Sequence, residues 1–283
     1  MRVIVTGHRG QLGNALLARL QSNHEVQGLD LPEHDITNRH AVQALVTEAS
    51  PDVVINSAAM TDVDGCARNP ELAYRVNGMG TQNLALAARA SGAEFMQIST
   101  NEVFEGTAQS PYYEWADRHP INAYGISKLA GEWYAERLLQ RFYIVRTAWL
   151  YAVGGRNFPH RIIQLADERG ALSVVDDEVS SPTFVPDLVE AIVQLLQTHA
   201  YGIYHLVNEG TVSRYELARA LIHHSGRGGV PIEPITSAAF QRASTPPPYT
   251  PLANNAAAAL GIRLRPWEEA VAAFVEEAGY RKP

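Results

Sequence analysis

Hydrophobic and polar residues follow two different periods along the first half of the chain. Short runs rich in β-branched and aromatic residues predict buried strands at residues 2–6, 25–29, 52–56, 95–99 and 142–146. The stretches between these runs have the spacing of amphipathic helices. Such alternation is typical of a parallel sheet with helices on both faces. We therefore expect an α/β, Rossmann-type doubly wound fold.

Polar residues and a proline mark where some of the helices should begin. One helix should follow Gly13 directly, and a second should begin near Asn38, with Asn38 or Thr37 as its N-cap. Pro70 indicates the start of a long helix over residues 70–91. A further helix contains Tyr124.

The second half of the chain is less regular. Helices are predicted at residues 161–169, at 186–198 and from Trp267 onward, and short strands near 173–175 and 202–207. We expect residues 1–150 to form a dinucleotide-binding Rossmann domain and residues 151–283 a smaller C-terminal α/β substrate-binding lobe. Segments near 180–208 should return to the main sheet.

The nucleotide-binding prediction depends on three glycines between the first strand and the first helix. Gly7 allows a tight turn, Gly10 lets the backbone approach a pyrophosphate, and Gly13 lets the helix pack on the strand. The helix N-terminus then offers unpaired N–H groups to phosphates. Asp30, at the end of the second strand, can bind an adenosine ribose and would favour NADH over NADPH. Arg9 could offset its charge, so both cofactors stay open.

Composition excludes several other classes of function. The chain of 283 residues has a net charge of −7 and no basic stripe, which argues against nucleic acid as a partner. No apolar run approaches the ~20 residues that span a bilayer. Cys66 is the single cysteine and excludes an intrachain disulfide. The first strand leaves no room for a signal peptide, so we expect a cytoplasmic protein. We expect no metal site, and Asp176, Asp177 and Glu178 predict a solvated turn.

Tyr124 and Lys128 are four residues apart and share one helix face. A free phenol has a pKa of about 10, and a nearby ammonium should lower that pKa. Such a pair can exchange a proton with an alcohol oxygen, although it also fits an exposed polar face. Thr100 ends the fourth strand, where ligands of parallel sheets gather, so we expect it beside the pair. Alone it could equally cap a turn.

Several motifs occur together and in a specific order. They are GHRGQLG, INSAAMTDVDGCARNP, RVNGMGTQNLA, ISTNEVFEG, PINAYGISKLAGE, RTAWLY, SSPTFVPDL and GIYHLVNEG. In this order the chain resembles the extended short-chain dehydrogenases/reductases, and within them the dTDP-4-dehydrorhamnose reductases. The resemblance implies NADPH- or NADH-dependent reduction of the 4-keto group of a nucleotide-linked 6-deoxysugar, completing dTDP-L-rhamnose.

The resemblance also implies roles for individual residues. Tyr124 would donate the proton, Lys128 would lower the pKa of Tyr124 and contact the ribose, and Thr100 would steady the substrate carbonyl. The implied cofactor contacts are Gly7, Arg9, Gly10, Gln11, Leu12, Gly13, Asp30, Asp35, Ile36, Ala58, Ala59, Thr61, Ser99, Tyr124 and Lys128. The implied substrate contacts are Val63, Thr100, Asn101, Glu102, Tyr124, Trp149, Asn157 and Phe158.

The chain departs from the family pattern after its fourth strand. The family usually has Ser-Thr-Asp-Tyr-Val-Phe there, whereas this chain has Asn101 and Glu102 at the Asp and Tyr positions. A buried carboxylate needs a partner or solvent. We hypothesise that the sugar is more polar, or differently oriented, than 4-keto-rhamnose. Candidates for holding its diphosphate, or simply for surface charge, are Arg214, Arg263 and Arg265.

Two alternatives remain at this point. The chain could be a reductase or epimerase that acts on another nucleotide sugar. It could also be a non-catalytic, cofactor-binding subunit like that of methionine adenosyltransferase, although the joint presence of Tyr124, Lys128 and Thr100 argues against this. Trp133 and Tyr134 are expected to be packing residues or part of a homodimer interface.

Overall fold

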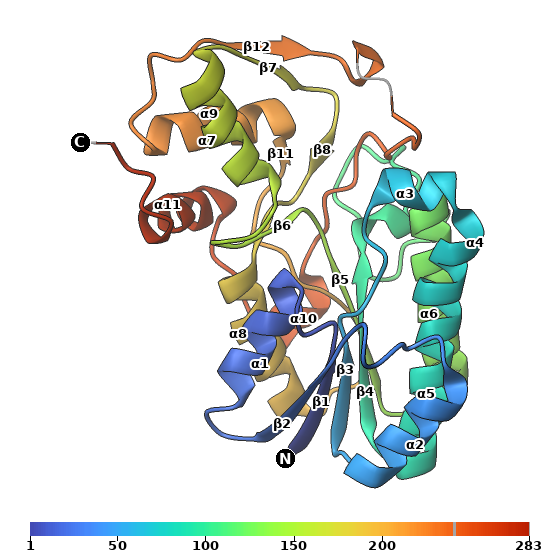
Figure 1. Ribbon diagram of the computed structural model, residues 1–283. Helices are drawn as coiled ribbons and strands as arrows, with labels where there is room; N and C mark the ends of the chain where they lie inside the picture. Colours follow the sequence, from blue (N-terminus) through green and yellow to red (C-terminus); the bar gives the residue numbers. More distant parts are fainter. Residues whose placement is uncertain (240–241, 283) are drawn as a thin grey trace.

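A six-stranded parallel sheet forms the centre of the computed structural model, which describes residues 1–239 and 242–282 (Figure 1). The order of the strands is β10-β5-β4-β3-β1-β2, and all neighbours run parallel. The strands are β1 (Arg2–Thr6), β2 (Glu25–Leu29), β3 (Val53–Asn56), β4 (Glu94–Thr100), β5 (Phe142–Thr147) and β10 (Gly202–His205). The order reverses between β1 and β3, so a ligand crevice is expected at their carboxyl ends. The predicted doubly wound fold is confirmed.

Helices cover both faces of this sheet (Figure 1). On one face lie α1 (Gln11–Leu20), α8 (Val185–Thr198) and α10 (Asn255–Ala259); on the other lie α2 (Arg39–Ala49), α5 (Thr81–Ser91) and α6 (Ala123–Leu138). Successive residues of β1 point to opposite faces: Val3 and Val5 belong to the core under α1, and Ile4 to the core under α5. Burial on both faces explains why these strands are continuous hydrophobic runs.

The long helix predicted over residues 70–91 is not regular. The chain runs through α3 (Val63–Arg68) and α4 (Pro70–Ala73), then a π-helical stretch η1 (Tyr74–Gly80), and only then α5. The side chain of Asn77, inside the π-helical stretch, donates to Met60 O (3.0 Å) and to Ser127 Oγ (2.9 Å). These contacts to distant segments accompany the widened turn.

A second lobe contains most of the remaining elements. Its helices are α7 (Phe158–Arg169), α9 (Arg214–His224) and α11 (Trp267–Glu277). Its short strands pair two by two: β6 (Leu150–Tyr151) with β9 (Thr183–Phe184), β8 (Val179–Ser180) with β11 (Val212–Ser213), and β7 (Leu172–Val175) with β12 (Ile232–Ile235). Short 3₁₀ turns occur at η2 (Asn101–Val103) and η3 (Ser237–Ala239). The lobe has a core of its own around Phe184 and Phe274.

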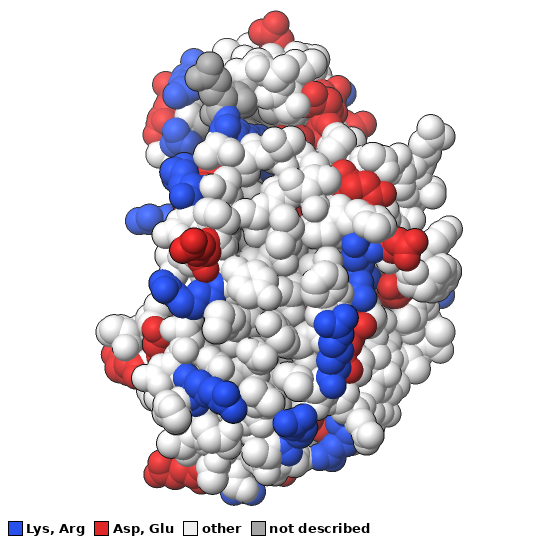
Figure 2. All heavy atoms as spheres, turned by 90° about the vertical axis from the view of Figure 1, so that its right-hand side faces the viewer, with Lys and Arg blue, Asp and Glu red and all other residues white. Residues whose placement is uncertain are grey.

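The surface formed by α4, α5 and α6 carries mixed charge. Figure 2 shows positive and negative side chains interspersed around an uncharged central area on this face. Several large apolar side chains in this part of the chain are exposed, among them Tyr74 of η1 and Trp133 of α6. Within the described part of the chain, no helix is long and apolar enough to cross a membrane.

Candidate active site

One cavity of about 720 Å³ opens at the carboxyl ends of β1 to β5, between the sheet and the second lobe. This volume is in the range of small-molecule sites. Every residue for which the family resemblance implies a cofactor or substrate contact lines this cavity. The set joins segments that lie far apart in the sequence, from Gly7 to Phe158. The structure therefore brings the nominated residues together, and their individual roles stay proposals.

The glycine turn at one end of the cavity has the shape that a dinucleotide requires. Gly7 has φ +69°, and a Cβ there would lie 2.7 Å from Ala58 N. A Cβ on Gly13 would lie 2.1 Å from Gly7 O. The N-cap of α1 is Gly10, so no side chain caps the helix, and its first turn has no acidic residue. Its free N–H groups at the cavity suit the phosphates of NAD(P)H.

Asp30 and Arg9 lie next to this turn. The carboxylate of Asp30 accepts hydrogen bonds from Arg9 N (2.8 Å) and Leu31 N (2.8 Å). The guanidinium of Arg9 donates to Leu31 O and pairs with Glu33 at 2.9 Å, while its side chain stays half exposed. A carboxylate and a half-exposed guanidinium thus flank the position expected for the adenosine ribose, which is compatible with either NADH or NADPH.

The N-terminus of α6 directs Tyr124 and Lys128 toward the end of β4. Asn122 caps the helix, its Oδ1 accepting from Gly125 N (2.8 Å). Lys128 Nζ donates to Ile98 O at 2.6 Å, and the Tyr124 hydroxyl hydrogen-bonds with Thr100. A phenol, an ammonium and an aliphatic hydroxyl therefore converge on one end of the cavity.

Burial has the largest effect on the pKa values of Tyr124 and Lys128. It raises the pKa of Tyr124; the negative charge of Glu102 adds to the rise, and the hydrogen bond to Thr100 opposes it. Burial lowers the pKa of Lys128 to about 8, against the opposing charge of Glu132. The predicted low pKa of Tyr124 is wrong, because desolvation of the phenolate raises this pKa and Lys128 is not among the groups that shift it here. Tyr124 consequently stays protonated at neutral pH.

The wall at the expected sugar position is polar. Glu102, which is partly buried, accepts a hydrogen bond from Asn122 Nδ2 at 2.7 Å. Burial raises the pKa of Glu102, while the Asn122 hydrogen bond and the charge of Arg214 act against that rise. Asn101 points into the protein, where its Nδ2 donates to Thr250 Oγ1 (2.6 Å) and Ser180 Oγ (3.2 Å). The partner that Glu102 was expected to need is thus Asn122.

Trp149 and Asn157 connect this wall to the glycine turn. Trp149 has φ +44°, an unusual value for a bulky residue and one often found at functional sites. The guanidinium of Arg214 lies 4.1 Å from the centroid of the Trp149 ring. Asn157 Nδ2 donates to Gln11 Oε1 at 3.0 Å, so the loop before α7 contacts the first helix directly.

Of the three candidate arginines, the structure places one at the cavity. Arg214 lines it, while Arg265 pairs with Asp187 at 2.7 Å and Arg263 with Glu209 at 3.6 Å. The solvated turn predicted at residues 176–178 is wrong at its third residue. Glu178 is buried because it pairs with Arg214 (2.6 Å) and with Arg242.

The cavity also has lining residues that the sequence did not nominate. They include Thr147, the last residue of β5, and Ala148, the residue after it, together with Tyr151, Arg156 and Leu217 from the second lobe. The first two could have been found, because they lie at the carboxyl end of a predicted parallel strand. The others come from a half without a regular period.

The Rossmann-type sheet, the glycine turn and the Tyr124–Lys128 arrangement define the class: an NAD(P)-dependent oxidoreductase of the extended short-chain dehydrogenase/reductase type. Residues 1–279 match the family described as the RmlD substrate binding domain. The chain belongs to this family.

Relatives and solved structures agree with this assignment. The chain is 37% identical to the spore coat polysaccharide biosynthesis protein SpsK of Bacillus subtilis, over 98% of this chain and 97% of that protein. It is also 37% identical to dTDP-4-dehydrorhamnose reductase of Mycobacterium tuberculosis, over 96% and 91%. The structure of a dTDP-4-dehydrorhamnose reductase from Clostridium acetobutylicum superposes with a TM-score of 0.95 at 38% identity, covering 99% and 100%. That of the Bacillus anthracis enzyme, in complex with NADP, gives 0.94 at 38% identity, covering 98% and 99%.

Proposed function

We propose that this protein reduces the 4-keto group of a nucleotide-linked 6-deoxysugar with NADPH or NADH, most specifically dTDP-4-dehydro-L-rhamnose to dTDP-L-rhamnose. The observation that carries the proposal is the convergence of Tyr124, Thr100 and Lys128 in the same cavity as an uncapped helix N-terminus. The names of the M. tuberculosis and C. acetobutylicum relatives support the substrate class, and the NADP complex of the B. anthracis relative supports the cofactor.

The cofactor, when bound, supplies the hydride. The residues of this chain supply the proton and the electrostatic environment. As negative charge grows on the carbonyl oxygen, the Tyr124 hydroxyl gives it a proton, and the Thr100 hydroxyl donates a hydrogen bond to it. The ammonium of Lys128 stabilises the phenolate left on Tyr124. The ketone thus gains one hydride and one proton, and solvent restores the proton of Tyr124.

The protonation states found in the site suit this direction of transfer. A proton donor must carry its proton, and the raised pKa of Tyr124 ensures this at neutral pH. The pKa of Lys128, about 8, leaves most of its amine charged at pH 7. Activity should therefore decline as pH rises through the Lys128 pKa, because the phenolate then loses its counter-charge.

Glu102 favours a second candidate, which is reduction of a differently oriented 4-keto-6-deoxysugar. A relative from Streptomyces niveus, 36% identical over 95% of both chains, is named dTDP-4-keto-6-deoxy-D-glucose reductase. The carboxylate of Glu102 offers a hydrogen-bond acceptor at the position where the resemblance implies an aromatic wall. The homodimer and the cytoplasmic location expected from the sequence stay predictions.

Loss of NADPH absorbance with dTDP-4-keto-6-deoxysugars tests the proposal directly. Tyr124→Phe removes the proton donor and should lower kcat by about 10²–10⁴-fold while NADPH binding, followed by fluorescence, is kept. Tyr134→Phe is the matched control: this phenol is on the same helix but contacts Tyr74 Oη (3.3 Å), outside the cavity lining. Normal turnover by Tyr124→Phe would refute the assignment. NADPH binding without oxidation of any nucleotide-sugar mixture would favour the non-catalytic subunit.

A further inference from the structure

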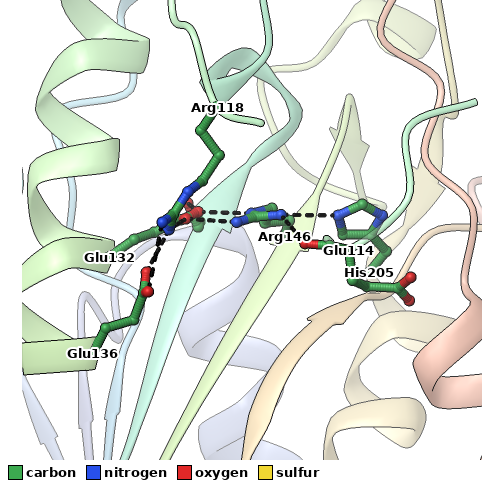
Figure 3. Close-up of polar contacts among 7 residues, drawn as sticks. Glu114, Arg118, Glu132, Glu136, Arg146 and His205 are labelled. Atoms are coloured by element: carbon green, nitrogen blue, oxygen red, sulfur yellow. Dashed lines mark hydrogen bonds and ion pairs between the residues drawn. The ribbon is translucent and has the colours of Figure 1, made fainter. Parts of the chain in front are cut away.

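The functional face of α6 continues inward beyond the cavity. Tyr124, Lys128, Glu132 and Glu136 follow one another at four-residue spacing and so share one face of the helix. The first two line the cavity, whereas the side chain of Glu132 is fully buried one turn behind Lys128. Figure 3 shows Glu132 and Glu136 reaching from α6 toward Arg118, with Arg146 on the far side of Glu132.

Every oxygen of the Glu132 carboxylate is hydrogen-bonded. Oε1 accepts from Ser99 Oγ (2.5 Å) and Arg146 Nε (2.9 Å). Oε2 accepts from Arg146 Nη2 (2.8 Å) and Arg118 Nη1 (2.9 Å). Burial opposes ionisation, yet the charge and hydrogen bonds of Arg146 hold the pKa of Glu132 below its usual range. Glu132 is therefore a fully ionised carboxylate inside the protein.

Arg146 is itself held in one orientation. Its Nη1 donates to Glu114 O (3.0 Å) and lies 3.3 Å from His205 Nε2 (Figure 3). Burial, together with the charge of Arg146, lowers the pKa of His205 to about 3, so this ring is neutral. Its Nδ1 donates to Ala253 O (3.2 Å), which leaves Nε2 to accept from Arg146. The guanidinium that pairs with Glu132 thus cannot easily turn away.

Two consecutive residues of β4 connect this network to the reaction site. Glu132 binds the hydroxyl of Ser99, and Lys128 binds the carbonyl of Ile98. The next residue is Thr100. Because both hydrogen bonds come from one face of α6, they hold this helix against the end of β4. The same helix face carries Tyr124, and the same strand end carries Thr100.

The same carboxylate is also the group that most strongly favours the charged form of Lys128. From its own helix, Lys128 faces Glu132 and Tyr124, and from α3 it faces the Cys66 thiol; burial lowers the pKa of Lys128, while Glu132 and then Cys66 oppose this. Behind Glu132 lie the positive charges of Arg146 on β5 and Arg118 in the loop before α6. Without the Glu132 carboxylate, Arg146 would lose its counter-charge near Lys128, and Arg118 would keep only Glu136.

We propose that Glu132 is a positioning residue of the reductase, which acts through Lys128 and Ser99 to keep the ammonium charged and the end of β4 in register with α6. Its effect on turnover rests on the proposed reduction. Its effect on the charge of Lys128 does not, so the two claims can fail separately.

The chain offers a direct way to measure that charge, because Lys128 and Lys282 are its only lysines. With ¹³C-labelled lysine, NMR should show two Cε signals, which Lys282→Arg assigns. In the parent protein the Lys128 signal should titrate with a midpoint near 8. In Glu132→Gln, which keeps the shape and an acceptor oxygen but removes the charge, the midpoint should fall by about one pH unit or more.

Kinetics provide the second readout. In Glu132→Gln, the alkaline limb of the kcat/KM profile should shift to lower pH, together with the NMR midpoint of Lys128. Glu136→Gln is the matched control, since Glu136 is on the same face but contacts only Arg118 among these groups; its limb should stay within about 0.3 of a unit of the parent. Arg118→Gln removes a positive charge from the other side of Glu132. The alkaline limb of this variant should shift to higher pH by a few tenths of a pH unit.

These variants separate the proposal from a purely structural ion pair. If Glu132 were only part of a structural ion pair, Glu132→Gln would lower the melting temperature but leave the Lys128 titration midpoint and the alkaline limb of kcat/KM unchanged. That result would overturn the proposal. If the buried substitution unfolds the chain, the partly exposed Arg118→Gln decides: an unchanged or lowered Lys128 midpoint refutes the inference. A parent that shows no turnover would reject the proposed function, while the NMR titration would still judge the role of Glu132.

Discussion

Glu102 shows how one residue can change the character of a site without changing its chemistry. Its carboxylate accepts a hydrogen bond from Asn122 and lies within the electrostatic reach of Arg214 and Arg242, while Glu178 acts with the opposite sign. These contacts oppose, but do not cancel, the desolvation that raises the pKa of Glu102. Glu102 lines the same cavity as Tyr124, and its carboxyl oxygen can offer an acceptor to a sugar hydroxyl.

Replacement of Glu102 by tyrosine should change which sugar is preferred. The variant restores an aromatic wall and removes an acceptor, so kcat/KM for dTDP-4-dehydro-L-rhamnose should rise relative to that for the alternative 4-keto-6-deoxysugar by about 10-fold or more. The two substrates are compared in the same NADPH-oxidation assay. The KM for NADPH serves as the control and should not change. An unchanged ratio between the sugars would show that residue 102 does not select the substrate.

For individual residues of the site, the sequence could predict which side chains meet, but not their protonation states. Motif order and strand-end topology were sufficient to place Gly7, Thr100 and Tyr124 around one cavity. The direction of the Tyr124 pKa was missed because it depends on burial, which a local spacing of four residues does not reveal. Similarly, nothing near Glu102 in the sequence indicates Asn122, twenty residues away, as its partner.

Among the elements, α6 has a start that serves both folding and chemistry. The Oδ1 of Asn122 caps the helix at Gly125 N, and its Nδ2 donates to Glu102 and to Thr245 O (3.2 Å). A Cβ on Gly125 would lie 2.1 Å from Glu102 O, so the first turn of α6 packs directly on the chain after β4. One side chain therefore fixes both the helix that carries Tyr124 and the wall opposite it.

Asn122→Ala should consequently have a larger effect than the loss of an ordinary N-cap, because it should reduce both stability and activity. Loss of a cap destabilises by about 0.5–2 kcal/mol. Here the change also leaves the Glu102 carboxylate without its amide, so kcat should fall as well. The matched control is Asn38→Ala, because Asn38 caps α2 on the exposed surface by accepting from Ala41 N (3.2 Å). Urea unfolding and NADPH oxidation check both variants; equal activities in the two would contradict the dual role.

The sequence predicted helices and strands correctly where the hydrophobic period was long and uninterrupted. The central strands match their predicted ranges to within one residue at each end up to β5, and the N-cap of α2 is Asn38, one of the two residues that the sequence suggested. The π-helical stretch at Tyr74–Gly80 was missed because its contacts, from Asn77 to Met60 and Ser127, come from distant segments. Two-residue strands such as β6 and β9 exist only through their partners, so no local pattern could predict them.

For the molecule as a whole, the chain passes more than once between the cores beside the central sheet and the core of the second lobe. The core under α1 contains Leu188 and Ile192 of α8, and also Ile262 and Leu264 from near the C-terminus. Strand β10 adds the sixth strand beside β5. The second lobe encloses its own core yet contributes lining residues to the cavity. The site thus depends on both halves being folded together.

A fragment of residues 1–150 should therefore not fold as an independent domain. It lacks α8, which covers Leu16 and Val5 on one face of the sheet, and it lacks β10, so the edge of β5 would present unpaired backbone groups. We expect no cooperative thermal transition by circular dichroism and no NADPH binding by calorimetry. The full chain under identical conditions should show both. A sharp transition in the fragment, with NADPH bound, would instead establish residues 1–150 as a self-sufficient dinucleotide-binding domain.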